Sequence, residues 1–338
     1  MKAGKRTGSC SWMLFLWGVW VCASCTGGTN SFLMPSSSGN PYEVLVVADP
    51  QVWKRPAGRT LWDLLDTDMP GLPQSERAFR IMHADPWDFD ATLRLAKNIL
   101  VLDVDSTKYR RVSFACATDV YAKPQLVVTM QVPDEDSLAA AVAQYGASLL
   151  RLFTQAERKR RVEWLADHHG VYVAEQVKEL FACDVWVPAE LDSYKVGQDF
   201  FWAGTHTATA DKNFVMYAYP YAGGDAFTKA GFIHKRDSVM KVNVPGARPG
   251  MYMATDSLMT DVRLFSLGGD TICEARGLWR VKGDFMGGPF VSHARLDKAR
   301  HRVVVCEVFV YAPDRMKRNL IRQLEASLYT LRLPEDVQ

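Results

Sequence analysis

The chain lacks the motifs that identify several large enzyme classes. Its 338 residues contain no P-loop and no Rossmann glycine fingerprint, so nucleotide binding has no support. They also contain no G-x-S-x-G nucleophile elbow, which removes the signature of the α/β-hydrolases. No histidine pair has H-E-x-x-H spacing and no cysteine spacing matches a zinc motif, so we expect no metal site. Nothing in the sequence calls for a cofactor.

An excess of positive charge is also missing. The chain has 40 Lys and Arg against 38 Asp and Glu, and three of the basic residues but no acid lie within residues 1–25. The remainder therefore carries 37 basic against 38 acidic residues (40 − 3 = 37). Binding to nucleic acid requires clustered positive charge, so a nucleic-acid partner is excluded as the general expectation.

No apolar run is long enough to span a membrane. The leading run, Trp12–Ser24, has thirteen residues after the basic Lys2, Lys5 and Arg6, whereas a spanning helix needs ~20. This pattern is typical of a secretory signal peptide. Small residues at its end precede Cys25, as in a bacterial lipobox, although Cys22 occupies the position where Leu, Val or Ile is usual. We predict a signal peptide over 1–24 and lipidation of Cys25.

The segment after Cys25 has the composition of a tether. Residues 25–41 are rich in Gly, Ser, Thr, Asn and Pro and cannot bury a core. We therefore expect attachment to the membrane through an N-terminal lipid. The expected location is the cell envelope, on the periplasmic side and at the outer membrane, although the sequence does not decide which membrane holds the anchor.

Strand and helix patterns alternate through the rest of the chain. Apolar runs predict strands at 42–50, 98–105, 112–122, 124–132, 183–191, 199–208, 213–221, 251–258, 260–267, 271–283, 289–297 and 302–312. Helical spacing predicts helices at 58–66, from Asp134 or Asp136 to about 169, and at 173–181, 226–243 and 314–331.

The two halves repeat one local order: a strand, Pro-Asp and an amphipathic helix, at 124–142 and again at 303–321. This favours an α+β fold with two sheet-plus-helix modules, over 42–170 and 171–334. We expect their sheets to be largely antiparallel or mixed.

Several segments resemble a known family. These are "PYEVLVVAD", "DVYAKPQLV", "CDVWVPAEL", "FIHKRDSVMK", "MYMATDSL", "RGLWRVKGDFMGGPFVSHAR" and "VYAPDRMKRNLIRQLEASLYTL". Together, over 41–334, they resemble the Bacteroidota lipoproteins grouped as domain of unknown function 4837. The resemblance implies an envelope lipoprotein and supplies no activity. Exported surface lipoproteins of Bacteroidota tend to carry acids just after the lipidated cysteine, and none follows Cys25 closely, which favours the periplasmic side.

The stretch "GGPFVSHAR" places Ser292 next to His293, which invites a hydrolase interpretation. Successive side chains of a strand point to opposite faces, so these two cannot form a nucleophile–base hydrogen bond. We expect Gly287 and Gly288 to shape a turn. If Asp297 pairs with Arg302 in a hairpin, His293 faces Cys306 and Ser292 faces Glu307.

Two further clusters carry charged side chains. In "IHKRDS", His234 and Asp237 share a helix face, which suits either a base oriented by a carboxylate or a solvated ion-pair face. In "RGLWRVKGD", an exposed Trp279 could bind a ligand together with Arg276, Lys282 and Asp284, or it could pack under a helix.

Glu307 interrupts an apolar strand and needs a partner if it is buried, with Arg276 and Arg295 as candidates. The basic run "ERKRR", 157–161, suits either a solvated helix face or contact with anionic lipid. Four cysteines, Cys116, Cys183, Cys273 and Cys306, are either free and buried or include one disulfide.

Two functions follow as hypotheses. The leading one is a lipid-anchored, non-catalytic binding or assembly module with an envelope protein or a glycan as partner. The alternative is an envelope hydrolase that uses His234, Asp237 and His293. The weaker ligand-binding candidates are Arg276, Trp279, Lys282, Asp284 and Glu307.

Overall fold

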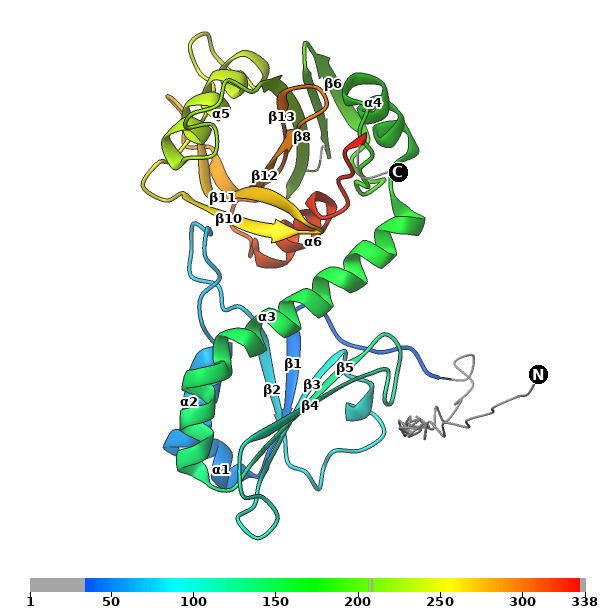
Figure 1. Cartoon of the computed structure of the whole chain (residues 1–338), viewed down its shortest axis with the longest axis vertical. Helices are drawn as coiled ribbons and strands as arrows, with labels where there is room; N and C mark the ends of the chain where they lie inside the picture. The colour runs from blue at the N-terminus through cyan, green and yellow to red at the C-terminus, as the bar shows by residue number, and fades with distance from the viewer. Residues whose placement is uncertain (1–33, 206, 208, 335–338) are drawn as a thin grey trace, which may run out of the picture. The chain divides into compact units, whose positions relative to one another are not determined.

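Two β-sheets, one in each half of the chain, carry the helices (Figure 1). The computed structural model describes residues 34–205, 207 and 209–334. The predicted signal peptide 1–24, Cys25 and the first part of the predicted tether lie outside these residues. From Pro35 onward the described chain belongs to one compact unit.

The first sheet is mixed. Its order is β2 (Arg80–Ala84), β1 (Glu43–Val47), β3 (Asn98–Val104), β5 (Leu126–Val132) and β4 (Ser113–Thr118). The pairs β1–β2, β1–β3 and β3–β5 are parallel, and β4 pairs antiparallel with β5. All five residues of β1 are buried, because parallel strands are covered on both faces.

Helices cover one face of this sheet. They are α1 (Pro50–Lys54), α2 (Pro56–Leu65) and α3 (Glu135–His168), and a short turn of helix, η2 (Leu93–Leu95), lies in the loop before β3. The carboxylate of Asp134, one of the two candidates from the sequence, caps α3 by accepting a 2.8 Å hydrogen bond from the Ser137 backbone N–H. With 34 residues α3 is about 50 Å long, so it extends past the first sheet and also packs against α6 of the second half.

The second sheet is antiparallel. Its order is β10 (Asp261–Leu267), β11 (Asp270–Val281), β12 (Gly287–Asp297), β13 (Arg302–Tyr311), β8 (Asp211–Pro220), β7 (Phe200–Gly204) and β6 (Ser193–Gly197), and β9 (Met253–Thr255) pairs with β11. The mixed and antiparallel sheets, with their helices, confirm the predicted α+β class.

Helices lie on both faces of the second sheet (Figure 1). Helices α4 (Val171–Phe181) and α6 (Arg318–Leu328) bury their apolar sides against one face, and α5 (Lys229–Asn243) covers the other. Alternation along β13 divides its side chains, so Val304 and Cys306 face α6 whereas Val303 and Val305 face α5. This division decides which charged side chains can meet.

Two element predictions were wrong. The last helix begins at Arg318 rather than Asp314, because Asp314 takes a left-handed conformation with φ of 57°. Residues 183–191 form no strand: their backbone makes only isolated bridges, although Val185, Val187 and Leu191 are buried in the core. Pro188 lacks the N–H that a ladder would need.

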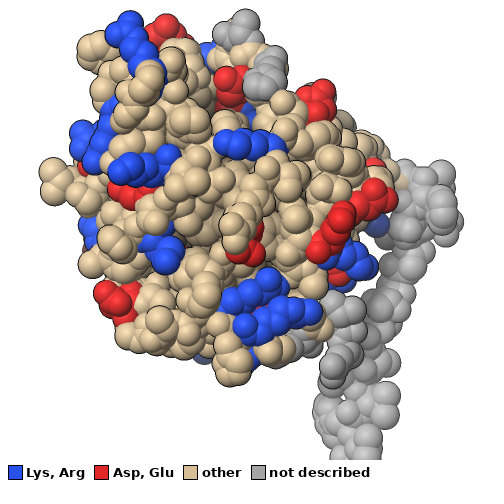
Figure 2. Space-filling view, turned by 90° about the horizontal axis from the view of Figure 1, so that it is seen from above, with Lys and Arg blue, Asp and Glu red and all other residues tan. Residues whose placement is uncertain are grey.

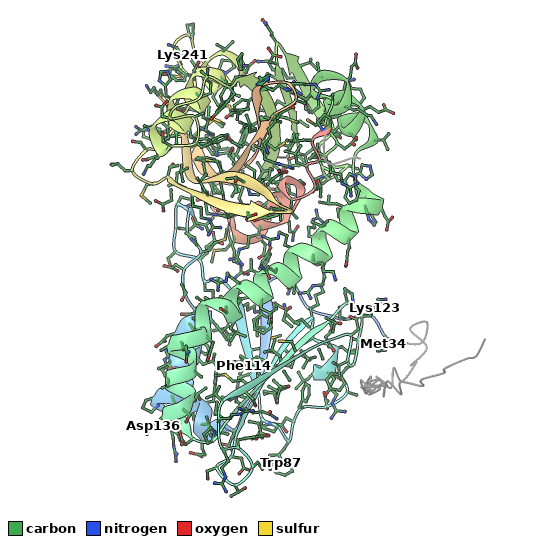
Figure 3. The ribbon with its side chains drawn as sticks, viewed as in Figure 1. Met34, Trp87, Phe114, Lys123, Asp136 and Lys241 are labelled. Atoms are coloured by element: carbon green, nitrogen blue, oxygen red, sulfur yellow. The ribbon has the colours of Figure 1, made fainter. Side chains whose placement is uncertain are left out.

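Pro35 lies beside the loop that leads into β5. The backbone N–H of Lys123, which is labelled in Figure 3, donates to the Pro35 carbonyl at 2.9 Å. On the face shown in Figure 2, basic and acidic side chains are interspersed, in keeping with the near-neutral charge balance. Among the described residues, no helix has the length and apolar character that crossing a membrane requires.

Candidate ligand-binding site

The β12–β13 hairpin has the predicted register. Asp297 pairs with Arg302, His293 with Cys306, and Ser292 with Glu307. His293 lies among Phe265 and Tyr329 on the α6 side, whereas Ser292 and Glu307 lie on the α5 side. The strand therefore separates serine from histidine, as expected. The prediction that Gly287 and Gly288 shape a turn was wrong, because both belong to β12.

Glu307 is fully buried, and its partner is Arg236 of α5. Arginine Nε and Nη2 donate to the two carboxylate oxygens at 2.8 and 2.6 Å. The proposed partners Arg276 and Arg295 were wrong, because both point to the other face of the sheet. Arg276 bonds to Glu325, and Arg295 bonds to Asp270 and to the Leu331 carbonyl.

Sequence reasoning missed Arg236 as the buried member of "IHKRDS". The signal was present, because Phe232, Arg236 and Met240 recur at every fourth residue and all three are buried against the sheet. An arginine in the apolar row of a helix indicates a buried carboxylate opposite. Stacking of its guanidinium over Phe290, 4.2 Å from the ring centroid, completes the packing.

His234 and Asp237 border a shallow pocket together with Ser238, Lys241 and Tyr252. Asp237 is already engaged: its Oδ1 accepts hydrogen bonds of 2.8 and 2.7 Å from the backbone N–H and hydroxyl of Thr255. Within the described part of the chain it makes no hydrogen bond to His234. His293 lies buried on the opposite face of the sheet, so the three residues of the hydrolase alternative do not converge.

The ligand-binding candidates of "RGLWRVKGD" are also dispersed. Trp279 is 3% exposed and packs on Phe309, with ring centroids 5.5 Å apart, so it cannot stack on a ligand as the exposed-Trp interpretation required. Lys282 and Asp284 lie in the exposed turn after β11, where Lys282 sits over the Tyr252 ring. Arg276, in contrast, borders a cavity.

That cavity has a volume of about 430 Å³, and five of its fifteen lining residues are arginines; we call it the arginine pocket. Its walls come from the loop after α2, from α3, β10 and β11, and from α6 with the residue that follows it. The lining residues are Met69, Pro70, Leu150, Arg151, Thr154, Gln155, Arg158, Arg263, Phe265, Ser266, Leu267, Arg276, Arg322, Glu325 and Tyr329.

Two of the arginines are paired with carboxylates. Arg276 donates to Glu325 at 2.6 Å. Arg263 reaches the buried Glu274 through two nitrogens, each 2.9 Å from Oε1. Burial opposes ionisation of Glu274, but His293, Arg276 and Arg263 outweigh it and lower the pKa of its carboxyl to about 2. The Arg263–Glu274 ion pair is therefore intact at neutral pH.

The other three arginines, Arg151, Arg158 and Arg322, have no carboxylate at ion-pair distance among the described residues. The guanidinium of Arg158 lies 3.7 Å from the centroid of the Tyr329 ring. Arg322 stacks over Tyr42 at 4.4 Å and donates to the Ala78 carbonyl at 3.0 Å. Burial lowers the pKa of Arg322 below its ordinary value.

No local sequence motif predicts this pocket, because its arginines are spread from position 151 to position 322. The basic run "ERKRR" contributes one residue to the pocket. In the structure this run is neither a solvated face nor a continuous basic surface. Glu157 is buried and accepts from Asn98 and Arg160 at 2.7 and 2.8 Å, while Arg161 lies over Trp164. Arg158 alone enters the arginine pocket.

The cysteines carry no obvious chemistry. Cys183, Cys273 and Cys306 are buried and Cys116 is exposed on β4, so the expectation that all four are buried was wrong for Cys116. All four are free thiols. Burial raises the pKa of Cys183 and of Cys273 to about 11, which keeps both protonated at neutral pH. No group of His, Cys, Asp and Glu in the described chain is arranged to hold a metal ion.

Comparisons with known proteins identify families without an assigned activity. Residues 37–165 match the family described as domain of unknown function DUF8532. No curated protein matches the chain. Among solved structures, the Ran-binding protein Mog1p of Saccharomyces cerevisiae is similar over 45% of this chain and 89% of its own, with 10% identity and a TM-score of 0.30. A TM-score this low supports no conclusion about fold or function.

The second half of the chain matches a different family model. The model of the domain of unknown function DUF4837 matches residues 171–330, a narrower range than the resemblance over 41–334 suggested. The predicted resemblance is confirmed for this part of the chain: residues 171–330 match the DUF4837 family model.

Proposed function

We propose that this protein is a lipid-anchored, non-catalytic binding module of the cell envelope, held on the periplasmic side of the outer membrane, and that its ligand site is the arginine pocket. The observation that carries the binding role is a 430 Å³ cavity containing three arginines without a carboxylate partner in the described chain. Cavities of this size with a few convergent polar groups are the usual form of small-molecule sites.

The hydrolase alternative has no comparable support. General base catalysis needs a base within hydrogen-bond reach of the reacting group and a partner that orients it. Asp237 is engaged with Thr255, and His293 lies on the other face of the sheet from His234. We therefore propose binding rather than turnover.

The anchor is supported by the sequence around Cys25. A basic start, a thirteen-residue apolar run, Ala23-Ser24 and then cysteine provide what processing and thioether attachment need, and a polar tether follows. Three acyl chains on one cysteine would make release from the membrane negligible, since each buried CH₂ contributes ~0.8 kcal/mol.

The anchor is tested by feeding cells that express the full chain with radiolabelled palmitate. Wild type and Cys22→Ala should carry label and fractionate with outer membranes, whereas Cys25→Ala should carry none. Cys22→Ala is the matched control, because it changes the neighbouring cysteine of the same segment. Label retained by Cys25→Ala would refute lipidation at this position.

The binding role is tested with the purified chain and a small-molecule extract of bacterial envelopes. After incubation and desalting, denaturation should release a compound detectable by mass spectrometry from wild type, and much less of it from Arg151→Gln/Arg158→Gln. A chain that retains nothing but consumes a component of the extract would overturn the proposal in favour of an enzyme.

A further inference from the structure

We propose that the arginine pocket selects an organic anion: an oxyanion group, such as a carboxylate or a phosphate, carried on a flat apolar body. This inference rests on the proposed binding role of the same pocket and adds the chemical class of its ligand. It follows from the charge of the lining, from the orientation of two guanidinium groups, and from the apolar part of the wall.

The charge of the lining is strongly positive. Five arginines and one glutamate line the pocket, and Glu274 lies behind Arg263. Glu325 offsets Arg276 and Glu274 offsets Arg263, which leaves Arg151, Arg158 and Arg322. Like charges gathered in a cavity with low-dielectric walls raise the local concentration of anions. The positive charges of Arg151, Arg158 and Arg322 also repel one another. A neutral or cationic ligand would leave this repulsion in place, whereas an oxyanion would offset it.

The orientation of Arg158 leaves its donors available. Its guanidinium carbon lies 3.7 Å from the centroid of the Tyr329 ring, which is a stacking distance. A guanidinium that uses its flat face for stacking keeps its N–H groups at the edge, where they can form two parallel bonds to a carboxylate or phosphate. Arg158 is therefore both held in place and able to bind.

Arg322 is the most enclosed of the three. It is stacked over Tyr42, donates to the Ala78 carbonyl and is one of the residues that line the pocket. A charge withdrawn from water is costly unless it is paired. The ligand that would best stabilise Arg322 is an anion, and the lowered pKa of this guanidinium agrees with its desolvation.

The apolar part of the wall excludes a bare inorganic ion as the best ligand. Leu150, Phe265, Leu267 and Tyr329 border the same cavity, together with Met69 and Pro70. Phosphate alone would fill only a small part of 430 Å³ and would leave this surface wet. An aromatic or other flat apolar group beside the oxyanion would cover it.

A matched pair of fluorescent probes tests the inference. The anionic probe is 8-anilinonaphthalene-1-sulfonate, and the neutral one is N-phenyl-1-naphthylamine, which has the same rings without the sulfonate. Titrated into the purified full chain at low salt, the anionic probe should bind at least tenfold more tightly. Equal affinities would overturn the inference while leaving a binding role in place; no binding of either probe would count against both.

Variants locate the site. Arg151→Gln/Arg158→Gln should reduce the affinity for the anionic probe at least tenfold and leave the neutral probe within about twofold. Arg248→Gln removes one charge from an exposed loop that borders a different pocket, so it should change neither. An unchanged affinity in the double variant would overturn the inference.

Salt dependence gives a measurement on wild type alone, in case the double variant does not fold. Raising NaCl from 20 to 500 mM should weaken the anionic probe severalfold, because salt screens its attraction to the arginines. It should not weaken the neutral probe. Identical responses of the two probes would contradict an electrostatic site.

Discussion

Arg236 of α5 and Glu307 of β13 form an ion pair inside the protein, with both side chains fully buried. Nη1 of Arg236 also donates to the Thr255 hydroxyl at 2.9 Å, and that hydroxyl donates to Asp237 at 2.7 Å. One polar network therefore joins α5, β9 and β13. Removing either Arg236 or Glu307 leaves the other charge buried without its counter-ion, which costs far more than the pair itself contributes.

Replacing Arg236 by Met should lower the free energy of unfolding by about 3–5 kcal/mol, because the Glu307 carboxylate is left without its counter-ion in the core. The double variant Arg236→Met/Glu307→Leu should be markedly more stable than either single variant, since it removes both charges. Urea denaturation followed by tryptophan fluorescence measures all of these values. Arg248→Gln, at an exposed position, is the surface control.

The stability of the double variant shows whether the two residues interact. If it is destabilised by the full sum of the two single changes, the residues do not interact as the structure indicates. A loss below 1 kcal/mol for Arg236→Met would equally contradict a fully buried pair.

Glu274 makes the fold sensitive to acid. The pKa of its carboxyl is lowered from the ordinary 4.5 to about 2 in the folded protein, chiefly because His293, Arg276 and Arg263 outweigh the effect of burial. A depressed folded pKa stabilises above pH 4.5, and this contribution disappears as the pH falls from 4.5 towards 2. The loss from this group is at most about 3 kcal/mol.

The measurement is the urea midpoint of the purified chain between pH 6 and pH 2.5. Glu274→Gln should give a flatter curve than wild type below pH 4.5, whatever its stability at neutral pH. Glu163→Gln changes an exposed carboxylate of α3 and should keep the wild-type slope. Parallel curves for Glu274→Gln and wild type would show that Glu274 is not ionised through its arginines.

The sequence predicted the fold class because apolar strands and amphipathic helices are local patterns. It missed β2 and β6, which are the end strands of the two sheets and carry partly exposed side chains. Both are five residues long, and neither RIMHA (β2) nor SYKVG (β6) contains more than two consecutive apolar residues. It overpredicted a strand at 183–191, where burial by α4 and not a ladder explains the apolar residues.

The candidate site could be predicted only in part. Strand alternation correctly placed Ser292 opposite Glu307, but naming Arg236 as the partner required knowing which row of α5 faces the sheet. Predicting the arginine pocket would have required knowledge of how distant helices pack together. It forms because α3 extends beyond its own sheet and packs on α6, which brings Arg158 to Tyr329, and no short-range pattern encodes that contact.

Thiol labelling should separate Cys116 from the buried cysteines. Cys116 is exposed on β4, whereas Cys183, Cys273 and Cys306 are buried and burial raises the pKa of each thiol. Because the thiolate is the reactive form, maleimide should label Cys116 within minutes and the other three only in urea. The measurement is the mass difference between native wild type and Cys116→Ser. Equal labelling of the two would contradict the exposure of Cys116.

Gly288 allows β12 and β13 to approach each other closely. A Cβ atom added at this position would lie 2.0 Å from the Val310 carbonyl oxygen, and a backbone atom inside a ladder cannot move aside. Gly288→Ala should therefore destabilise the protein by about 1–3 kcal/mol or more, as overpacking does. At Gly170, the N-cap of α4, the nearest atom to an added Cβ is 3.4 Å away, so Gly170→Ala is a control without overpacking. It is expected to cost no more than about 1 kcal/mol, through the poorer N-cap. Urea denaturation measures the free energy of unfolding of both variants. Equal losses would mean that the spacing of β12 and β13 at Gly288 relaxes freely. The register that separates Ser292 from His293 would then also be less firmly held.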